Sequence, residues 1–136
     1  MANGASTTPA RSAPSGRRVT YEVVRQLGLA LPGVEESLSY GTPALKINGK
    51  LIARLKEDGE SLVIRIGFLE RQALMESDPA VFYITDHYLN YPAMLVRLSK
   101  VRRDRMRRLL EDAWARLAPK RLVSKGTRRE GRGTTR

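Results

Sequence analysis

The sequence predicts a single α+β domain in which helices cover a mainly antiparallel sheet of five strands, in the order αβββαββα. Apolar residues recur at helical spacing near both ends of the chain, around 20–30 and 102–118. Between these helices lie short segments with alternating or β-branched apolar residues, separated by turn residues. No βαβ-like unit recurs, which favours an antiparallel sheet. A chain of 136 residues has room for one hydrophobic core.

The first helix is predicted over 20–30. The Thr20 hydroxyl is placed to cap its first turn, and Val19 and Val24 have the spacing of a hydrophobic staple. The Leu31-Pro32-Gly33 sequence ends it.

Two further helices are expected. A short one begins near Phe68 and runs to about Met75, before Pro79. The last runs from about Arg102 to Ala118. Its apolar residues form one stripe that faces the core: Met106, Leu109, Leu110, Ala113, Trp114 and Leu117.

The clearest strand signal lies within 43–66. Asn48-Gly49 separates the apolar segments 44–47 and 50–55, and a type I′ turn needs the positive φ angles that Asn-Gly readily adopts. A second polar turn at 57–60 leads into a third strand at 61–66. These three strands are predicted to form an antiparallel meander.

Two more strands are expected at 80–85 and 94–98, separated by a loop at 86–92. The polar stretch between the first helix and residue 43 is interpreted as a loop. These assignments complete the five-stranded sheet.

The composition excludes several classes of site and protein. The chain has no cysteine, so it has no disulfide, thiolate zinc site or cysteine nucleophile, which fits a reducing compartment such as the cytoplasm. No apolar run is long enough to span a bilayer, and 1–18 lacks the apolar segment of a secretory signal. We expect 1–18 to be a disordered basic leader, 19–123 the folded domain and 124–136 a disordered basic tail.

The net charge of +11 is unevenly distributed. Residues 1–18 contribute +3, residues 124–136 contribute +4, and the 17 basic and 13 acidic residues of 19–123 contribute the other +4. Either this charge serves solubility or it marks a polyanion-binding surface. The candidate phosphate-binding residues are Arg97, Lys100, Arg102, Arg103, Arg105, Arg107 and Arg108, with Lys125, Arg128 and Arg129 in the tail.

No catalytic constellation is evident. His87 is the only histidine, so a multi-histidine metal site is excluded, and no nucleophile accompanies it. We expect His87 to be structural and the protein to need no metal or cofactor. Tyr40, Thr42, His87 and Tyr91 could share a small-molecule pocket if their two loops meet at one edge.

Several short segments form an ordered pattern along the chain: residues 31–36, 39–44, 87–92, 96–98, 111–114 and 118–122. In this order they resemble the MmcQ/YjbR family over about 19–123. The resemblance implies a compact domain with an antiparallel sheet, similar to frataxin-like or secretion-chaperone-like folds. It also implies a DNA-binding role, the usual label of the family, for which no reaction or cofactor is established. The basic terminal segments are not part of the family pattern.

The sequence and the resemblance together predict a non-catalytic protein that binds DNA or RNA through phosphates, with low specificity and as a monomer. Two alternatives remain open. The domain could instead be a chaperone-like interaction module for an acidic protein partner, or a small-molecule-binding protein that uses the Tyr40, His87 and Tyr91 region.

Overall fold

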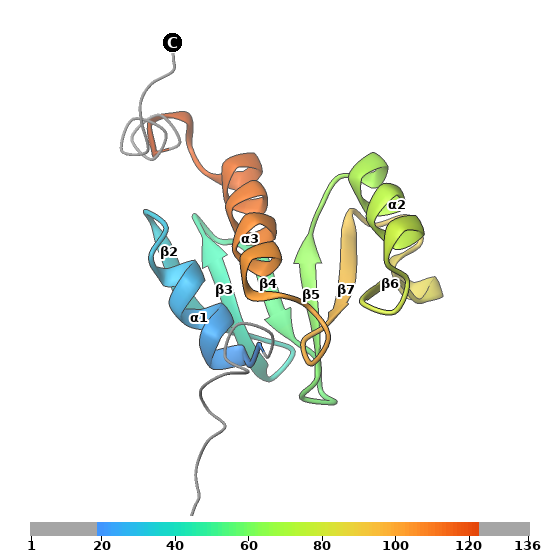
Figure 1. The fold of residues 1–136 in the computed structure, drawn as a ribbon. Coiled ribbons are helices and arrows are strands. Elements are labelled where there is room, and N and C mark those ends of the chain that lie inside the picture. Colours follow the sequence, from blue (N-terminus) through green and yellow to red (C-terminus); the bar gives the residue numbers. More distant parts are fainter. Residues whose placement is uncertain (1–18, 123–136) are drawn as a thin grey trace, which may run out of the picture.

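A computed structural model describes residues 19–122 and confirms the α+β class and the antiparallel sheet (Figure 1). The predicted leader 1–18 and tail 124–136 lie outside the described residues. The helices are α1 (Tyr21–Leu29), α2 (Phe68–Ser77) and α3 (Arg103–Leu117), with a short 3-10 helix, η3 (Asp86–Tyr88). The strands are β2 (Val34–Ser39), β3 (Thr42–Ile47), β4 (Lys50–Leu55), β5 (Ser61–Arg65), β6 (Phe82–Tyr83) and β7 (Ala93–Arg97).

Within residues 19–122 the sheet has six strands rather than the five predicted, in the order β2-β3-β4-β5-β7-β6. The additional strand is β2, which the sequence analysis interpreted as a loop. It is mostly polar and lies at the edge of the sheet, where it pairs with β3, so it carries no apolar alternation. β6 is shorter than the predicted 80–85 strand, and it pairs with β7 through two residues only.

α1 begins as the sequence predicts. The Thr20 hydroxyl accepts a hydrogen bond from the Val23 amide at 3.3 Å, and Val19 and Val24 are both buried in the core. The helix lies so close to β3 that a Cβ atom on Gly28 would come within 2.4 Å of the Leu45 side chain. Glycine at position 28 therefore allows this close packing.

Two hairpins have two-residue turns whose central residues both have positive φ. The predicted Asn48-Gly49 turn has φ values of 52° and 78°. The β2–β3 hairpin turns at Tyr40-Gly41 with φ values of 54° and 81°. Asparagine tolerates this backbone region, whereas a tyrosine rarely adopts it.

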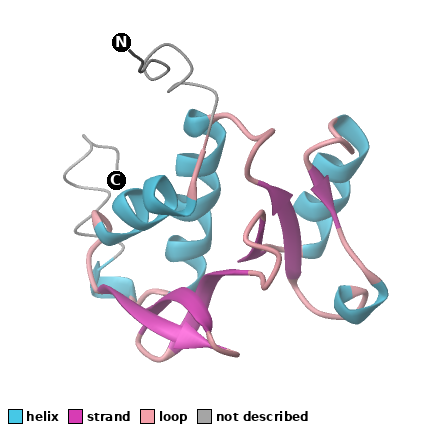
Figure 2. Cartoon of the chain, turned by 90° about the horizontal axis from the view of Figure 1, so that it is seen from below, coloured by secondary structure: helices cyan, strands magenta, loops and turns pink. Residues whose placement is uncertain are grey.

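Helices α1, α2 and α3 lie on one side of the sheet (Figures 1 and 2). Strand residues such as Ile52, Ile64 and Val96 point toward them and form the main core. The predicted α3 stripe packs here, with all its members buried except the half-buried Leu117. The Trp114 indole donates to the Pro32 carbonyl at 2.8 Å and thereby joins α3 to the end of α1.

The opposite face of the sheet is covered only in part. Residues 86–92 pass behind the β5–β7 end of the sheet in Figure 1, and Tyr88 packs there on Val63, Ala93 and Leu95. We call this side the open face. None of the helices within residues 19–122 is both long and apolar enough to cross a membrane.

The turn between β4 and β5 is organised by the Asp58 carboxylate. Its Oδ1 accepts from the Glu60 and Ser61 amides at 2.8 and 2.9 Å, and its Oδ2 accepts from the Ser61 hydroxyl at 3.0 Å. The same hydroxyl lies 2.8 Å from the Tyr83 hydroxyl on β6. The Glu60 amide is the largest cause that holds the pKa of Asp58 below its usual value.

We predict that Asp58→Ala lowers the free energy of unfolding by about 1 kcal/mol at pH 7, a figure discounted because the carboxylate is exposed. The folded pKa is depressed, so this stabilisation is present above the unfolded pKa and is lost as the pH falls through the folded pKa. Thermal melts at several pH values check this. The gap between parent and Asp58→Ala should narrow below about pH 4, whereas the gap between Asp58→Asn and Asp58→Ala should stay constant, because neither variant titrates at position 58.

Candidate nucleic-acid interface and open-face cleft

The predicted basic residues gather mainly around the start of α3. We call five exposed residues from the loop after β7 and the first half of α3 the α3 basic edge: Lys100, Arg102, Arg103, Arg105 and Arg108. The apolar stripe of α3 faces the core, so the arginines of the same helix lie on its solvent side.

Few carboxylates neutralise this edge. Arg102 is 3.7 Å from Asp104, but both side chains are over 70% exposed, so the pair contributes little. Within residues 19–122, Arg103, Arg105 and Arg108 form no ion pair. Asp104 also accepts from the Arg105 amide at 2.9 Å, so that its charge is partly engaged by the backbone.

The other predicted phosphate contacts lie elsewhere. Arg97 extends over the open face, where it lies 4.1 Å from the Tyr83 ring centroid and donates to the Ala80 carbonyl. Arg107 pairs with Glu111 one helical turn on, at 3.4 Å. The tail candidates fall outside the described residues: Lys125, Arg128 and Arg129.

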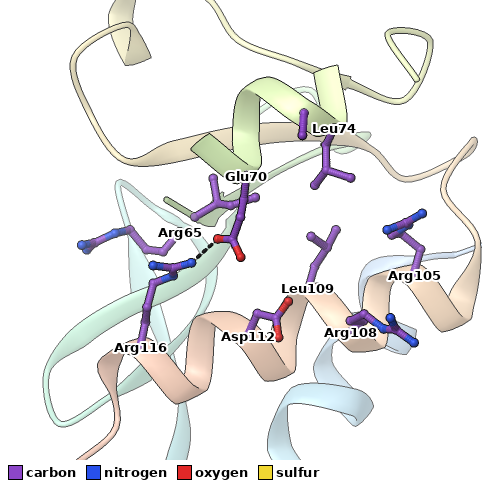
Figure 3. Close-up of a pocket in the computed structure, with 10 residues that line it drawn as sticks. Arg65, Glu70, Leu74, Arg105, Arg108, Leu109, Asp112 and Arg116 are labelled. Carbon is purple, nitrogen blue, oxygen red and sulfur yellow. Dashed lines mark hydrogen bonds and ion pairs between the residues drawn. The ribbon is translucent and has the colours of Figure 1, made fainter. Parts of the chain in front are cut away.

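A groove of about 220 Å³ separates α2 from α3 (Figure 3). Ile66 and Leu109 contribute apolar lining, and one end is lined by Arg105 and Arg108 of the α3 basic edge. At the other end Arg116 forms an ion pair with Glu70 of α2. A second, polar hollow of about 240 Å³ is lined by Arg102, Asp104, Arg105 and Arg108. The α3 basic edge therefore borders two hollows in the surface as well as carrying positive charge.

The largest of these hollows, about 640 Å³, lies on the open face, and we call it the open-face cleft. It brings together three of the four residues proposed from the sequence as a pocket, Tyr40, His87 and Tyr91. Thr42 does not line it, but its hydroxyl accepts from the Arg54 guanidinium at 3.1 Å. The remaining lining residues are Ser39, Lys46, Gly49, Leu51, Arg54, Glu57, Val63 and Tyr88.

One wall of the cleft is held by the buried Arg71 guanidinium of α2. Nη1 donates to the carbonyls of Tyr88, Tyr91 and Ala93 at 2.9 to 3.1 Å, and Nη2 donates to that of Leu89 at 3.0 Å. Within residues 19–122 no carboxylate pairs with Arg71, so these carbonyls supply its compensation. The arginine thereby fixes the segment that carries the cleft's aromatic side chains.

His87 is exposed and packs edge-on against Tyr88, with ring centroids 4.7 Å apart. In the part of the chain that the structure describes, no three His, Asp or Glu side chains gather to hold a metal ion. The geometry gives His87 a place in the cleft wall beside tyrosines.

The sequence analysis missed Lys46, Arg54 and Arg71. Each sits in a regular strand or helix, where a charged residue is normally solvated. The alternation of side chains along β4 does place Arg54 on the face of the sheet opposite to that of its neighbour, the core residue Ala53. That signal was available, but it did not show that the side chain would be buried.

Comparison with known proteins adds the family. A sequence model described as YjbR matches residues 29–116. Uncharacterized proteins of Mycobacterium tuberculosis and Mycobacterium bovis are each 41% identical over 51 residues. That match covers 38% of this chain and 40% of each relative, so the chain spans about two fifths of the length of these curated relatives.

The fold also has a solved counterpart. The crystal structure of DR2400 of Deinococcus radiodurans, which carries a DUF419 domain, superposes with a TM-score of 0.64. The superposition covers 75% of this chain and 80% of that one, at 17% sequence identity. At this identity the likeness shows a shared fold.

We predict that Arg71→Met lowers the free energy of unfolding by about 2–4 kcal/mol, because it leaves four carbonyls without their charged donor. Chemical denaturation measures the loss, and near-UV circular dichroism reports the tyrosines of 88–91. Arg65→Met is the matched control: Arg65 is half-buried, lies 5.5 Å from the Tyr91 ring and makes no hydrogen bond to another described side chain. Equal effects of the two variants would contradict the role given to Arg71.

Proposed function

The chain belongs to the YjbR family, and we propose that it is a non-catalytic nucleic-acid-binding protein that holds phosphates at the α3 basic edge. We expect it to act as a monomer, without a metal or cofactor. We also expect it to act in the cytoplasm, a reducing compartment that its lack of cysteine fits. Its targets would be DNA or RNA.

The observation that carries this proposal is the set of arginines at the start of α3 that have no ion-pair partner within residues 19–122. A helix N-terminus bears partial positive charge, so each exposed cation there opposes folding by roughly 0.3–1 kcal/mol. Farther along the same helix, by contrast, Arg107 and Arg116 have carboxylate partners. The stability of the helix therefore does not account for Arg103, Arg105 and Arg108, whereas a polyanionic ligand does.

The chemistry of this edge suits backbone contact more than base reading. Guanidinium and ammonium groups pair with phosphate oxygens of any sequence, and those contacts position a protein without specifying bases. The side chains lie along the solvent side of one helix start and the loop before it. We therefore expect low sequence specificity and steep dependence on salt.

A second candidate function has one observation in its favour. The groove between α2 and α3 combines an apolar lining at Ile66 and Leu109 with the cations Arg105 and Arg108. This combination would suit an acidic, partly apolar segment of a protein partner. Burial of apolar surface depends far less on salt than phosphate contact does, so salt dependence separates the two functions.

We predict that Arg102→Gln, Arg103→Gln and Arg105→Gln together weaken binding to a random 16-base-pair duplex. With about five phosphate contacts, the parent's log–log salt slope should be near −4.5, or roughly 2.7 decades between 50 and 200 mM salt. Losing three contacts should bring the slope to about −1.8. Fluorescence titration of the full chain at three salt concentrations measures both quantities. The melting temperature should hold or rise slightly, since the conflict with the helix dipole is relieved.

The control variant removes the same charge elsewhere. Lys50, Lys120 and Arg121 are exposed and lie away from the start of α3, and their replacement by Gln should change the slope by less than about 1. If the two triple variants weaken binding equally, only net charge matters. If neither weakens it, the α3 basic edge is a solvated surface and the proposed interface is wrong.

A further inference from the structure

The open-face cleft has the dimensions and lining of a small-ligand site. Its volume of about 640 Å³ falls within the roughly 300–1,000 Å³ of typical ligand pockets. Leu51, Val63 and Tyr88 contribute apolar and aromatic surface, while Lys46 and Arg54 contribute positive charge. The cleft lies across the sheet from α3, so it is distinct from the α3 basic edge.

Arg54 is the first unexplained feature of this cleft. Its side chain is 92% buried, yet its ion-pair partner within the described residues is the exposed Glu57, 3.6 Å away. Within residues 19–122, its hydrogen bonds to Thr42 and Leu55 and its ion pair with Glu57 all use Nη1. A buried guanidinium normally has most of its five N–H donors satisfied. Nε and Nη2 are therefore available to an acceptor that enters the cleft.

Tyr40 is the second unexplained feature of the cleft. It is 83% exposed and holds the left-handed φ of 54°, a backbone conformation that costs a residue with a side chain roughly 1–2 kcal/mol. The equivalent turn position in the next hairpin is Asn48, which tolerates that conformation. Neither core packing nor turn geometry asks for an aromatic ring at position 40. The ring lies 5.0 Å from the Arg54 guanidinium and forms one wall of the cleft.

We infer that the open-face cleft binds a planar base that carries a phosphate. The base lies against the exposed ring of Tyr40, because aromatic side chains stack on the π-face of any base. The phosphate is held by Lys46 and by the available donors of Arg54. Duplex DNA is not a ligand here, since its bases are already paired and stacked. A free nucleotide and an unpaired nucleotide of a single strand offer the same chemistry.

A substitution at Glu57 should change ligand affinity in the opposite direction to substitutions at Tyr40 and Lys46. A hydrogen bond from its own backbone amide, followed by the charges of Arg54 and Lys56, holds the pKa of Glu57 below its usual value. The carboxylate is therefore ionised at neutral pH, and it competes with an incoming phosphate for Arg54. Removing its charge should strengthen binding of an anionic ligand.

The test titrates the full chain with adenosine monophosphate, with adenosine and with a single-stranded oligodeoxyadenylate, by calorimetry. Tyr40→Asn should weaken binding roughly 5- to 100-fold, the range seen for losing one stacked base, while Tyr40→Phe keeps the ring and should stay within about twofold. Lys46→Gln should weaken binding and Glu57→Gln should tighten it. Asparagine accepts the left-handed turn, so Tyr40→Asn should melt within about 3 °C of the parent.

Each outcome decides something. Effects of Tyr40→Asn on the mononucleotide support a free-nucleotide site, and effects on the oligonucleotide alone support an unpaired-strand site. The inference is overturned if neither probe binds, if Tyr40→Asn binds like the parent, or if adenosine binds as tightly as its monophosphate. The triple variant of the α3 basic edge should bind the mononucleotide normally, so the failure of either proposal leaves the other standing.

Discussion

The hydrogen bonds of the buried Arg71 guanidinium are the interaction on which the open face depends. A buried charge without a carboxylate is costly unless hydrogen bonds compensate it. The carbonyls from Tyr88 to Ala93 provide those acceptors, and in doing so they fix a loop that has little regular structure of its own. Because Tyr88 and Tyr91 belong to that loop, a helix residue on one side of the sheet sets the shape of the cleft on the other.

The domain uses its cations in three different ways. Arg71 has its charge compensated by backbone carbonyls, and its role is structural. Arg54 is equally buried but only partly compensated, by Thr42, Leu55 and an exposed Glu57. The arginines of the α3 basic edge are exposed, so they are free to exchange water and counterions for phosphates. Degree of burial and pairing, more than the net charge of the chain, therefore distinguishes structural cations from candidate binding ones.

Local features of this fold were predictable from the sequence, and features set by distant segments were not. The Asn48-Gly49 turn and the apolar stripe of α3 depend on residues close in the chain, and both predictions were confirmed. β2 was missed because a polar edge strand owes its pairing to β3. The sequence brought Tyr40 and His87 together as one hypothesis, but the burial of Arg54 depends on the uncovered face, which no local pattern reveals.

The central claim is that this small domain has two separate anion-recognising surfaces, on opposite sides of its sheet. Amide chemical-shift mapping by NMR with two probes tests it most directly. Duplex DNA at low salt should shift amides of residues 100–108, while adenosine monophosphate should shift those of 40, 46, 54 and 87–91. If both probes shift the same residues, or if all shifts fall in segments 1–18 and 123–136, the account is contradicted.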